Sequence, residues 1–263
     1  MRFIDFHTHV YPDAIAHKAA ESVRAFYNLG NEAMDGTVDM LLQLGDAAGT
    51  DQYVILPVSN RPDRARHIND FILKTLEKQP RFFGFGTVHA AMENLMEEVE
   101  YIQKTGLRGL KMHPDSQVFA IDDERLFPVY EQLQGKLPVM LHMGDHRFDY
   151  SHPRRLCHVL ELFPKLQVIA AHFGGYEVYE EAYTLLRDKD CFFDVSSSLM
   201  FMAPGVAEDY INRYGAERFV YGSDYPMWDP KVEMERFLQL KLTPGQFEQI
   251  AHKTAEAILG LEP

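Results

Sequence analysis

Short apolar segments alternate with longer segments of helical periodicity along most of the chain. The apolar segments are rich in Val, Ile, Leu and Phe and end at turn residues, which predicts strands. Because they are almost continuously apolar, we expect both faces of each strand to be buried, as in a parallel sheet. The predicted strands cover residues 2–6, 52–57, 82–88, 107–113, 137–143, 166–171, 191–196 and 218–223.

The segments between the predicted strands have the spacing of amphipathic helices. Apolar residues there recur at i, i+3, i+4 and i+7, which places them on one helix face. After the third strand these residues are Met92, Leu95, Met96, Val99 and Ile102. The last predicted helix begins with Thr243 as N-cap and Pro244 at its first position, and it ends at Gly260.

Eight strands that alternate with helices predict an α/β fold, the (β/α)8 TIM barrel, as a single domain over residues 1–263. The interval between the first two strands is the longest. It holds residues 13–35, which we interpret as a lid or rim insertion over the barrel mouth. A doubly wound open sheet is the alternative, but the regular repeat and the lack of a Gly-rich phosphate fingerprint count against it.

Composition and charge exclude several classes of partner. A length of 263 residues suits one barrel of about 250 residues, and 46% hydrophobic residues suffice for its core. The net charge of −13 argues against a nucleic-acid partner. No apolar stretch reaches the ~18 residues of a membrane span, and the N-terminus lacks a signal-peptide pattern. Cys157 and Cys191 are interpreted as core thiols, so we expect a cytoplasmic protein.

Five polar residues lie at the ends of predicted strands. His7 and His9 follow the first strand, and His142, His172 and Asp224 accompany the fifth, sixth and eighth. In a barrel these ends converge on one mouth, where function resides. His7 and His9 are two positions apart, so both point to one side of an extended chain. Together with His142 and Asp224 they would form a mixed N/O set that suits Zn, Mn or Fe.

Each of these residues also has a structural interpretation. The His-x-His pair can lie on a surface turn, His172 can be a hydrogen-bonded core histidine, and Asp224 can cap the following segment. Gly174 and Gly175 permit an unusual turn after His172, which favours a rim position. The coincidence of four strand ends favours a common site.

Four motifs carry a resemblance to a known family. They are Asp-x-His-x-His at 5–9, Leu-His-Met-Gly at 141–144, Ala-His-Phe-Gly-Gly at 171–175 and Gly-Ser-Asp-Tyr-Pro at 222–226. The set resembles the amidohydrolase superfamily. More narrowly, it is similar to the amidohydrolase-related branch that includes aminocarboxymuconate-semialdehyde decarboxylase and resorcylate decarboxylases.

The resemblance implies a metal site and its chemistry. His7, His9, His142 and Asp224 would hold one divalent metal ion, Zn first, with Mn or Fe as alternatives. His172 would be the catalytic histidine, and either His172 or Asp224 would take a proton from the metal-activated water.

Further residues at the strand ends are candidates for substrate binding. Lys111 occupies the position where binuclear superfamily members carry a carboxylated, metal-bridging lysine. We interpret it instead as a cation that pairs with a substrate carboxylate, and the bridging role is the alternative. His113 would contact substrate, and Arg61 and Arg147 could each bind a carboxylate with two hydrogen bonds. Solvated surface arginines are the alternative for the last two.

Three functions follow from these expectations. The first is a metal-dependent hydrolase that attacks a carbonyl of a small carboxylated amide, ester or lactone. The second is a non-oxidative, metal-dependent decarboxylase of an unsaturated or aromatic acid, because one scaffold supports both reactions. The third is a metal-binding or assembly protein without catalysis, which the proton-transfer histidine argues against. The expected partner is a small, carboxylated substrate, and we expect a homodimer as the assembly if residues 13–35 contribute an interface.

Overall fold

The computed structural model describes residues 2–30 and 34–261. Each predicted strand forms, and the strands pair in parallel. Their bounds are β1 Ile4–Thr8, β2 Gln52–Ile55, β3 Phe82–Gly84, β4 Gly86–Thr87, β5 Leu110–Met112, β6 Val139–Leu141, β7 Val168–Ala170, β8 Phe192–Asp194 and β9 Phe219–Val220. The predicted strand 82–88 is divided at Phe85. The first strand both begins and ends two residues later than predicted, and because it ends at Thr8, His7 lies within it.

The strands close into a barrel. One run is β1-β2-β3 and the other follows the order β4 to β9. Phe85 joins the two runs, and its amide donates to the carbonyl of Ile55 at 3.0 Å. On the other side, the amide of Phe6 donates to the carbonyl of Tyr221 at 2.8 Å, which links β1 to the chain after β9. A doubly wound sheet has two free edges, so this closure confirms the TIM barrel.

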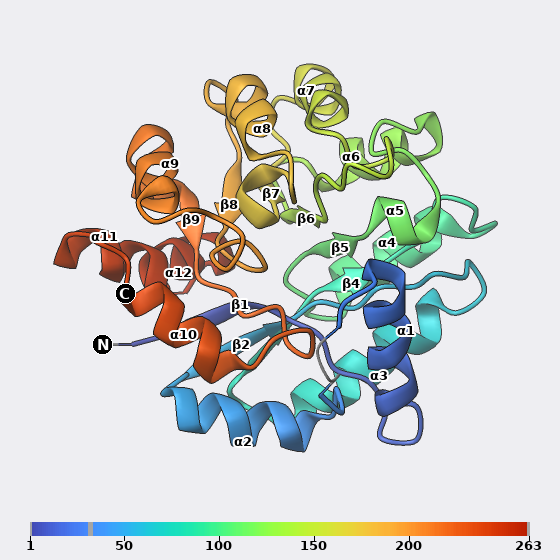
Figure 1. Cartoon of the computed structure of the whole chain (residues 1–263). Coiled ribbons are helices and arrows are strands. Elements are labelled where there is room, and N and C mark those ends of the chain that lie inside the picture. The colour runs from blue at the N-terminus through green and yellow to red at the C-terminus, as the bar shows by residue number, and fades with distance from the viewer. Residues whose placement is uncertain (1, 31–33, 262–263) are drawn as a thin grey trace.

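Helices surround the barrel (Figure 1). Their bounds are α1 Ala16–Tyr27, α2 Val38–Ala48, α3 Ala65–Lys78, α4 Leu95–Lys104, α5 Pro114–Gln117, α6 Phe127–Leu133, α7 Pro153–Leu162, α8 Tyr179–Leu186, α9 Val206–Tyr214, α10 Pro230–Leu238, α11 Pro244–Glu248 and α12 Thr254–Leu259. The predicted start of the last helix is confirmed, because Thr243 and Gln246 form a capping box around Pro244. A π-helical turn, Gln249–Lys253, joins α11 to α12, and Gly260 ends α12 in the left-handed conformation.

Two layers of apolar side chains hold the barrel together. The inner layer comprises Ile4, Phe6, Val54, Leu56, Phe85, Met140, Ile169, Ala171 and Val220, with Ala255, Ile258 and Leu259 of α12 packed against it. The outer layer lies between the strands and the surrounding helices. Glu256 of α12 accepts a hydrogen bond from Arg2 at 2.6 Å, which places α12 at the amino ends of the strands. The carboxyl ends therefore form the open mouth.

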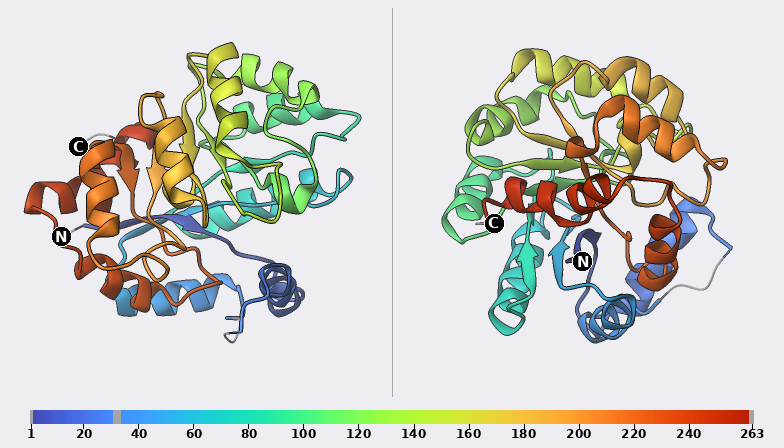
Figure 2. Two further views of the ribbon diagram at one scale, coloured as in Figure 1. Left: turned by 45° about the horizontal axis from the view of Figure 1, so that its top comes forward. Right: turned by 90° about the vertical axis from the view of Figure 1, so that its left-hand side faces the viewer.

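Helix α1 lies outside the strand–helix repeat, because it precedes α2 in the connection between β1 and β2. It stands at the lower right in the left-hand view of Figure 2, away from the two chain ends. Residues on one of its faces line a cavity at the barrel mouth. The predicted insertion at 13–35 includes α1, and its residues 31–33 lie outside the described part of the chain.

Among the described residues, no helix has the length and apolar character that crossing a membrane requires.

Candidate metal centre and substrate cavity

Three side chains at the barrel mouth bring their metal-binding atoms together. His7 lies in β1, His9 directly follows it, and Asp224 follows β9. The Nε2 atoms of the two histidines are 3.2 Å apart. Oδ1 of Asp224 lies 3.5 Å from Nε2 of His7 and 3.3 Å from Nε2 of His9. We call these three residues the donor set.

The second nitrogen of each imidazole in the donor set is held by an acceptor. Nδ1 of His7 donates to Oδ2 of Asp194 at 2.6 Å, and Nδ1 of His9 donates to the carbonyl of Leu56 at 2.5 Å. A neutral imidazole has one N–H, so Nε2 carries the free lone pair in both rings. Such partners fix the tautomer and orientation of histidine ligands.

The donor set fits a tetrahedral divalent ion. Zn binds histidine nitrogen and carboxylate oxygen at ~2.0–2.1 Å, which separates neighbouring ligand atoms by about 3.3 Å. The observed separations of 3.2, 3.3 and 3.5 Å agree with this geometry. Three protein ligands would leave one position open, as in catalytic metal sites.

Metal binding requires deprotonated ligands, and the surroundings of His7 and Asp224 favour that state. Burial, together with the nearby ammonium of Lys111, lowers the pKa of His7 well below its usual value. Burial alone would raise the pKa of Asp224, but the adjacent imidazoles of His7 and His9 hold it well below its usual value. Oγ of Ser197 also donates to Oδ2 of Asp224 at 2.5 Å.

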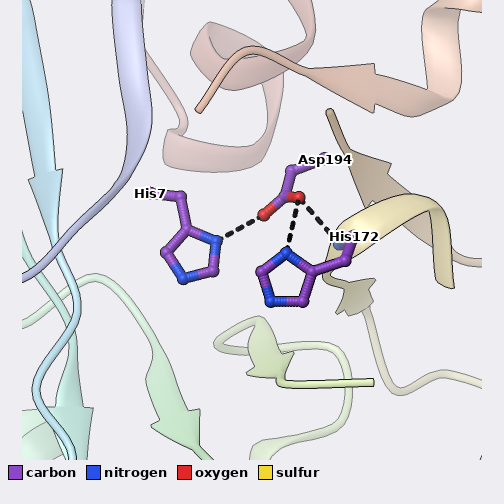
Figure 3. Close-up of side chains that lie close together, drawn as sticks. All are labelled: His7, His172 and Asp194. Carbon is purple, nitrogen blue, oxygen red and sulfur yellow. Dashed lines mark hydrogen bonds and ion pairs between the residues drawn. The ribbon is translucent and has the colours of Figure 1, made fainter. Parts of the chain in front are cut away.

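Asp194 ties the donor set to His172 (Figure 3). Its Oδ2 accepts from His7, and its Oδ1 accepts the backbone amide of His172 at 2.8 Å. Nδ1 of His172 lies 3.1 Å from the carbonyl of Ser196, and its Nε2 lies 3.0 Å from Nδ1 of His142. His142, which we predicted as the fourth ligand, therefore lies beside His172 and outside the donor set.

Lys111 brings a positive charge to the floor of the mouth. Its Nζ lies 3.3 Å from Nε2 of His7, and the residue is 1% exposed. Burial lowers the pKa of Lys111 to about 8, although the carboxylates of Asp194 and Asp224 oppose the shift.

A second group of potential ligands, His113, Asp115 and His142, lies in the same mouth. We call it the stacked cluster, because the rings of His113 and His142 lie 3.9 Å apart with an interplanar angle of 6°. The hydroxyl of Tyr27 lies 2.6 Å from Nε2 of His113 and 3.2 Å from Nε2 of His142. A histidine binds a metal in its ring plane at ~2.0–2.1 Å, so two parallel rings do not converge on one ion.

A cavity of about 650 Å³ opens from the donor set toward α1 and α3. It is lined by His7, His9, Lys111, His113, His142, His172 and Asp224 at its polar end. Side chains of α1, of α3 and of the segment after β2 line the remainder, and most of them are apolar.

The two arginines that we predicted as substrate contacts do not line this cavity. Arg61 is exposed and donates two hydrogen bonds to Asp63 at 2.8 and 3.0 Å. Arg147 donates to both carboxylate oxygens of Asp145 and to the carbonyl of Phe26 at 2.6 Å. Its guanidinium also lies over the ring of Phe26 at 5.0 Å. Both side chains are engaged by the protein: Arg147 connects α1 to the loop after β6, and Arg61 belongs to an exposed turn.

Sequence reasoning missed three residues of the mouth. Asp194 ends β8, and a charged residue at the end of an apolar strand could have identified it by the same criterion as His142. Ser197, which also accepts from Nε1 of Trp228 at 2.8 Å, and Tyr27 lie outside the strands and carry no such signal.

Several residues of the mouth have left-handed backbone conformations that favour glycine. The φ angles are 59° at His172, 49° at Ser197 and 59° at Asp224. Such conformations cost roughly 1–3 kcal/mol each and persist where the surrounding structure over-determines them.

A protein-family model described as Amidohydrolase matches residues 4–261. The chain belongs to the amidohydrolase family. This assignment confirms the resemblance to the amidohydrolase superfamily that the motifs at the strand ends indicated. No curated protein matches the chain.

Solved structures confirm the barrel of this amidohydrolase. An uncharacterized TIM-barrel protein from Bordetella bronchiseptica is 23% identical, with a TM-score of 0.82 and 99% of each chain covered. A 5-carboxyvanillate decarboxylase from Sphingomonas paucimobilis is 16% identical, with a TM-score of 0.74 and 99% of each chain covered. A dihydroxybenzoic acid decarboxylase from Polaromonas, with bound manganese and 2-nitroresorcinol, is 16% identical, with a TM-score of 0.75 over 98% of this chain and 97% of that chain.

Proposed function

We propose that this amidohydrolase is a metal-dependent, non-oxidative decarboxylase of an aromatic or unsaturated carboxylic acid. The observation that carries the proposal is the buried ammonium of Lys111 beside the donor set, at the polar end of an otherwise mostly apolar cavity. A substrate carboxylate is attracted to this cation and loses its water where the lining is apolar. The names of two structural neighbours, both decarboxylases of aromatic acids, support the same reaction.

The metal would be held by His7, His9 and Asp224, whereas His142, the fourth predicted ligand, lies against His172. When bound, a divalent ion would stabilise negative charge on substrate oxygen atoms. We propose Zn first, because the donor separations suit it, and Mn as the alternative, because one neighbour contains manganese.

Side chains of the mouth would bind the substrate and transfer the proton. Lys111 would bind the carboxylate, and His113, which follows the same strand, would contact the body of the substrate. As the bond between carbon and carboxylate breaks, its electron pair stays on the carbon and CO2 departs. His172 would give this carbon a proton from Nε2 as an imidazolium, because its Nδ1–H faces the Ser196 carbonyl. Asp224, which would hold the metal through Oδ1, is the second group able to carry a proton.

Hydrolysis of a small carboxylated amide, ester or lactone is the second candidate. The size of the cavity favours it, since about 650 Å³ leaves ample room for a tetrahedral carbon centre. In that reaction His172 or Asp224 would accept a proton from the attacking water.

Product analysis separates the two candidates. The protein is purified without chelator, its metal is measured by elemental analysis, and aromatic carboxylates and carboxylated amides, esters and lactones are tested in D2O. Decarboxylation predicts release of CO2 and one deuterium on the carbon that lost it. Hydrolysis predicts an acid product, without CO2.

Two variants test the roles of the side chains. We expect His172→Asn to retain metal and to lose about 10²–10⁴-fold in kcat, the usual contribution of a positioned acid or base. Arg61→Gln, in an exposed turn, is the control and should retain full activity. Full turnover by the metal-free protein would contradict both candidates.

A further inference from the structure

The cavity is much larger than the reacting part of a simple aromatic acid. A cavity of ~150 Å³ is enough to hold benzene. The volume of about 650 Å³ lies within the ~300–1,000 Å³ range of sites for drug-sized ligands. A single ring with its carboxylate at the donor set would leave most of this space to water.

The two ends of the cavity differ in chemistry. The donor set and Lys111 are gathered at the floor of the mouth, and Arg64 and His67, at the start of α3, also line the cavity. Away from the floor, α1 contributes Ala19 and Val23, and α3 contributes Ile68 and Phe71. These last four side chains are half-buried. Water in contact with such a wall is readily displaced by an apolar group, and that displacement favours binding.

The apolar wall of α1 is directed to the cavity and not to the barrel core. Ala19 and Val23 are four positions apart, so they lie on one helix face. Ala16 and Ala20 are the buried residues of this helix. Neither Ala19 nor Val23 belongs to, or packs against, the two core layers. Arg147 contacts the end of α1 through a hydrogen bond to the Phe26 carbonyl and a cation–π contact with the Phe26 ring, which help to hold this wall in position.

We propose that the substrate of this site is an acid with an extended apolar group, an alkyl chain or a second ring, which lies between α1 and α3 while its carboxylate faces Lys111. This inference rests on the proposed function for the reacting end of the substrate. It adds that affinity and selectivity come from the apolar group, and it assigns Ala19, Val23, Ile68 and Phe71 as the residues that determine chain length.

The test is a binding series measured by calorimetry. The probes are 4-methyl-, 4-butyl- and 4-hexylbenzoate, bound to the full chain with and without added Zn. Burial of each added methylene should tighten binding about fourfold. An increase in affinity of less than twofold from 4-methylbenzoate to 4-hexylbenzoate would overturn the inference.

Matched variants on α1 locate the apolar group. Ala19→Phe fills the cavity and should abolish the gain from methyl to hexyl while leaving the affinity for 4-methylbenzoate unchanged. Ala25→Phe places the same ring on the exposed face of α1, outside the cavity lining, and should leave the whole series unchanged. Ile68→Phe repeats the test from α3 should the α1 variant fail to fold. Equal effects of Ala19→Phe and Ala25→Phe would also overturn the inference.

The design separates this inference from the proposed function. If affinity rises with the length of the alkyl chain but does not depend on Zn, the result would support the apolar site and count against the metal-dependent reaction. Zn-dependent binding of 4-methylbenzoate without a chain-length gain would support the reacting end and overturn the inference. No binding of any probe in either state would overturn it as well.

Discussion

The donor set and the stacked cluster have the same composition, two histidines and one aspartate. In each group the potential ligand atoms lie within 4.8 Å of one another. They differ in the direction of their lone pairs. In the donor set, Asp194 and the Leu56 carbonyl bind the Nδ1 atoms, so the Nε2 atoms converge on Asp224. In the stacked cluster the rings are parallel, and one tyrosine hydroxyl lies against both Nε2 atoms.

The comparison shows that proximity of ligand types does not by itself make a metal site. Convergence requires that the outer nitrogen of each imidazole has an acceptor of its own. The stacked cluster lacks that arrangement and is better suited to contact a flat substrate. Each of the following variants tests this distinction.

The largest expected effect is the loss of metal from His7→Ala. Removal of one of three convergent ligands should reduce the content from about one ion per chain to a trace. The matched variant His113→Ala removes an imidazole from the stacked cluster and should retain the ion. Elemental analysis after dialysis measures the metal content of both variants. Loss of metal from His113→Ala but not from His7→Ala would mean that the stacked cluster, and not the donor set, holds the ion.

Asp194→Asn should weaken metal binding about 10–100-fold, the usual effect of losing the partner of a histidine ligand. The amide cannot accept from Nδ1 of His7 and the His172 backbone amide as the carboxylate does. Asp115→Asn makes the same change in the stacked cluster and should leave the affinity unchanged. Competition with a chelator measures it, and equal losses in both variants would indicate a general charge effect.

Tyr27→Phe should affect stability and leave metal content intact. The hydroxyl interacts with both nitrogens of the stacked pair, so its loss should lower the free energy of unfolding by about 1 kcal/mol. Urea unfolding of the metal-loaded protein measures this change. A loss of metal would mean that the stacked cluster does take part in ligation.

Arg147→Ala should have the smallest effect on metal content, but it should lower the free energy of unfolding by about 1–3 kcal/mol, because the fully buried carboxylate of Asp145 loses its arginine. Its local effect should be clear, since α1 loses the hydrogen bond to the Phe26 carbonyl. Hydrogen exchange should therefore be faster in α1. Arg147→Lys should behave similarly, because lysine lacks the planar fork that binds Asp145. Unchanged exchange in both variants would remove the role of Arg147 in fastening α1.

The sequence predicted the barrel because strand periodicity and turn residues are local signals. The same signals placed His7, His9, His172 and Asp224 at one mouth. They could not show how imidazoles rotate about their side-chain bonds, so His142 was assigned to the donor set although its Nδ1 faces His172.

The positions of Arg61 and Arg147 outside the cavity lining have a common cause. Each arginine pairs with an aspartate two residues before or after it, and a strand-end position alone does not reveal that pairing. The contribution of Tyr27 was not predictable either. It depends on how α1 folds back over strands that lie more than 80 residues away, since Tyr27 and His113 are separated by 86 positions.

The left-handed backbone at His172, Ser197 and Asp224 has a consequence for laboratory evolution. Glycine would relax these positions, because it lacks the Cβ atom that makes positive φ unfavourable. A screen that rewards heat resistance alone should therefore enrich such substitutions and discard the reaction with them. A screen that rewards turnover should keep the strained residues and accumulate its stabilising changes in the outer helices.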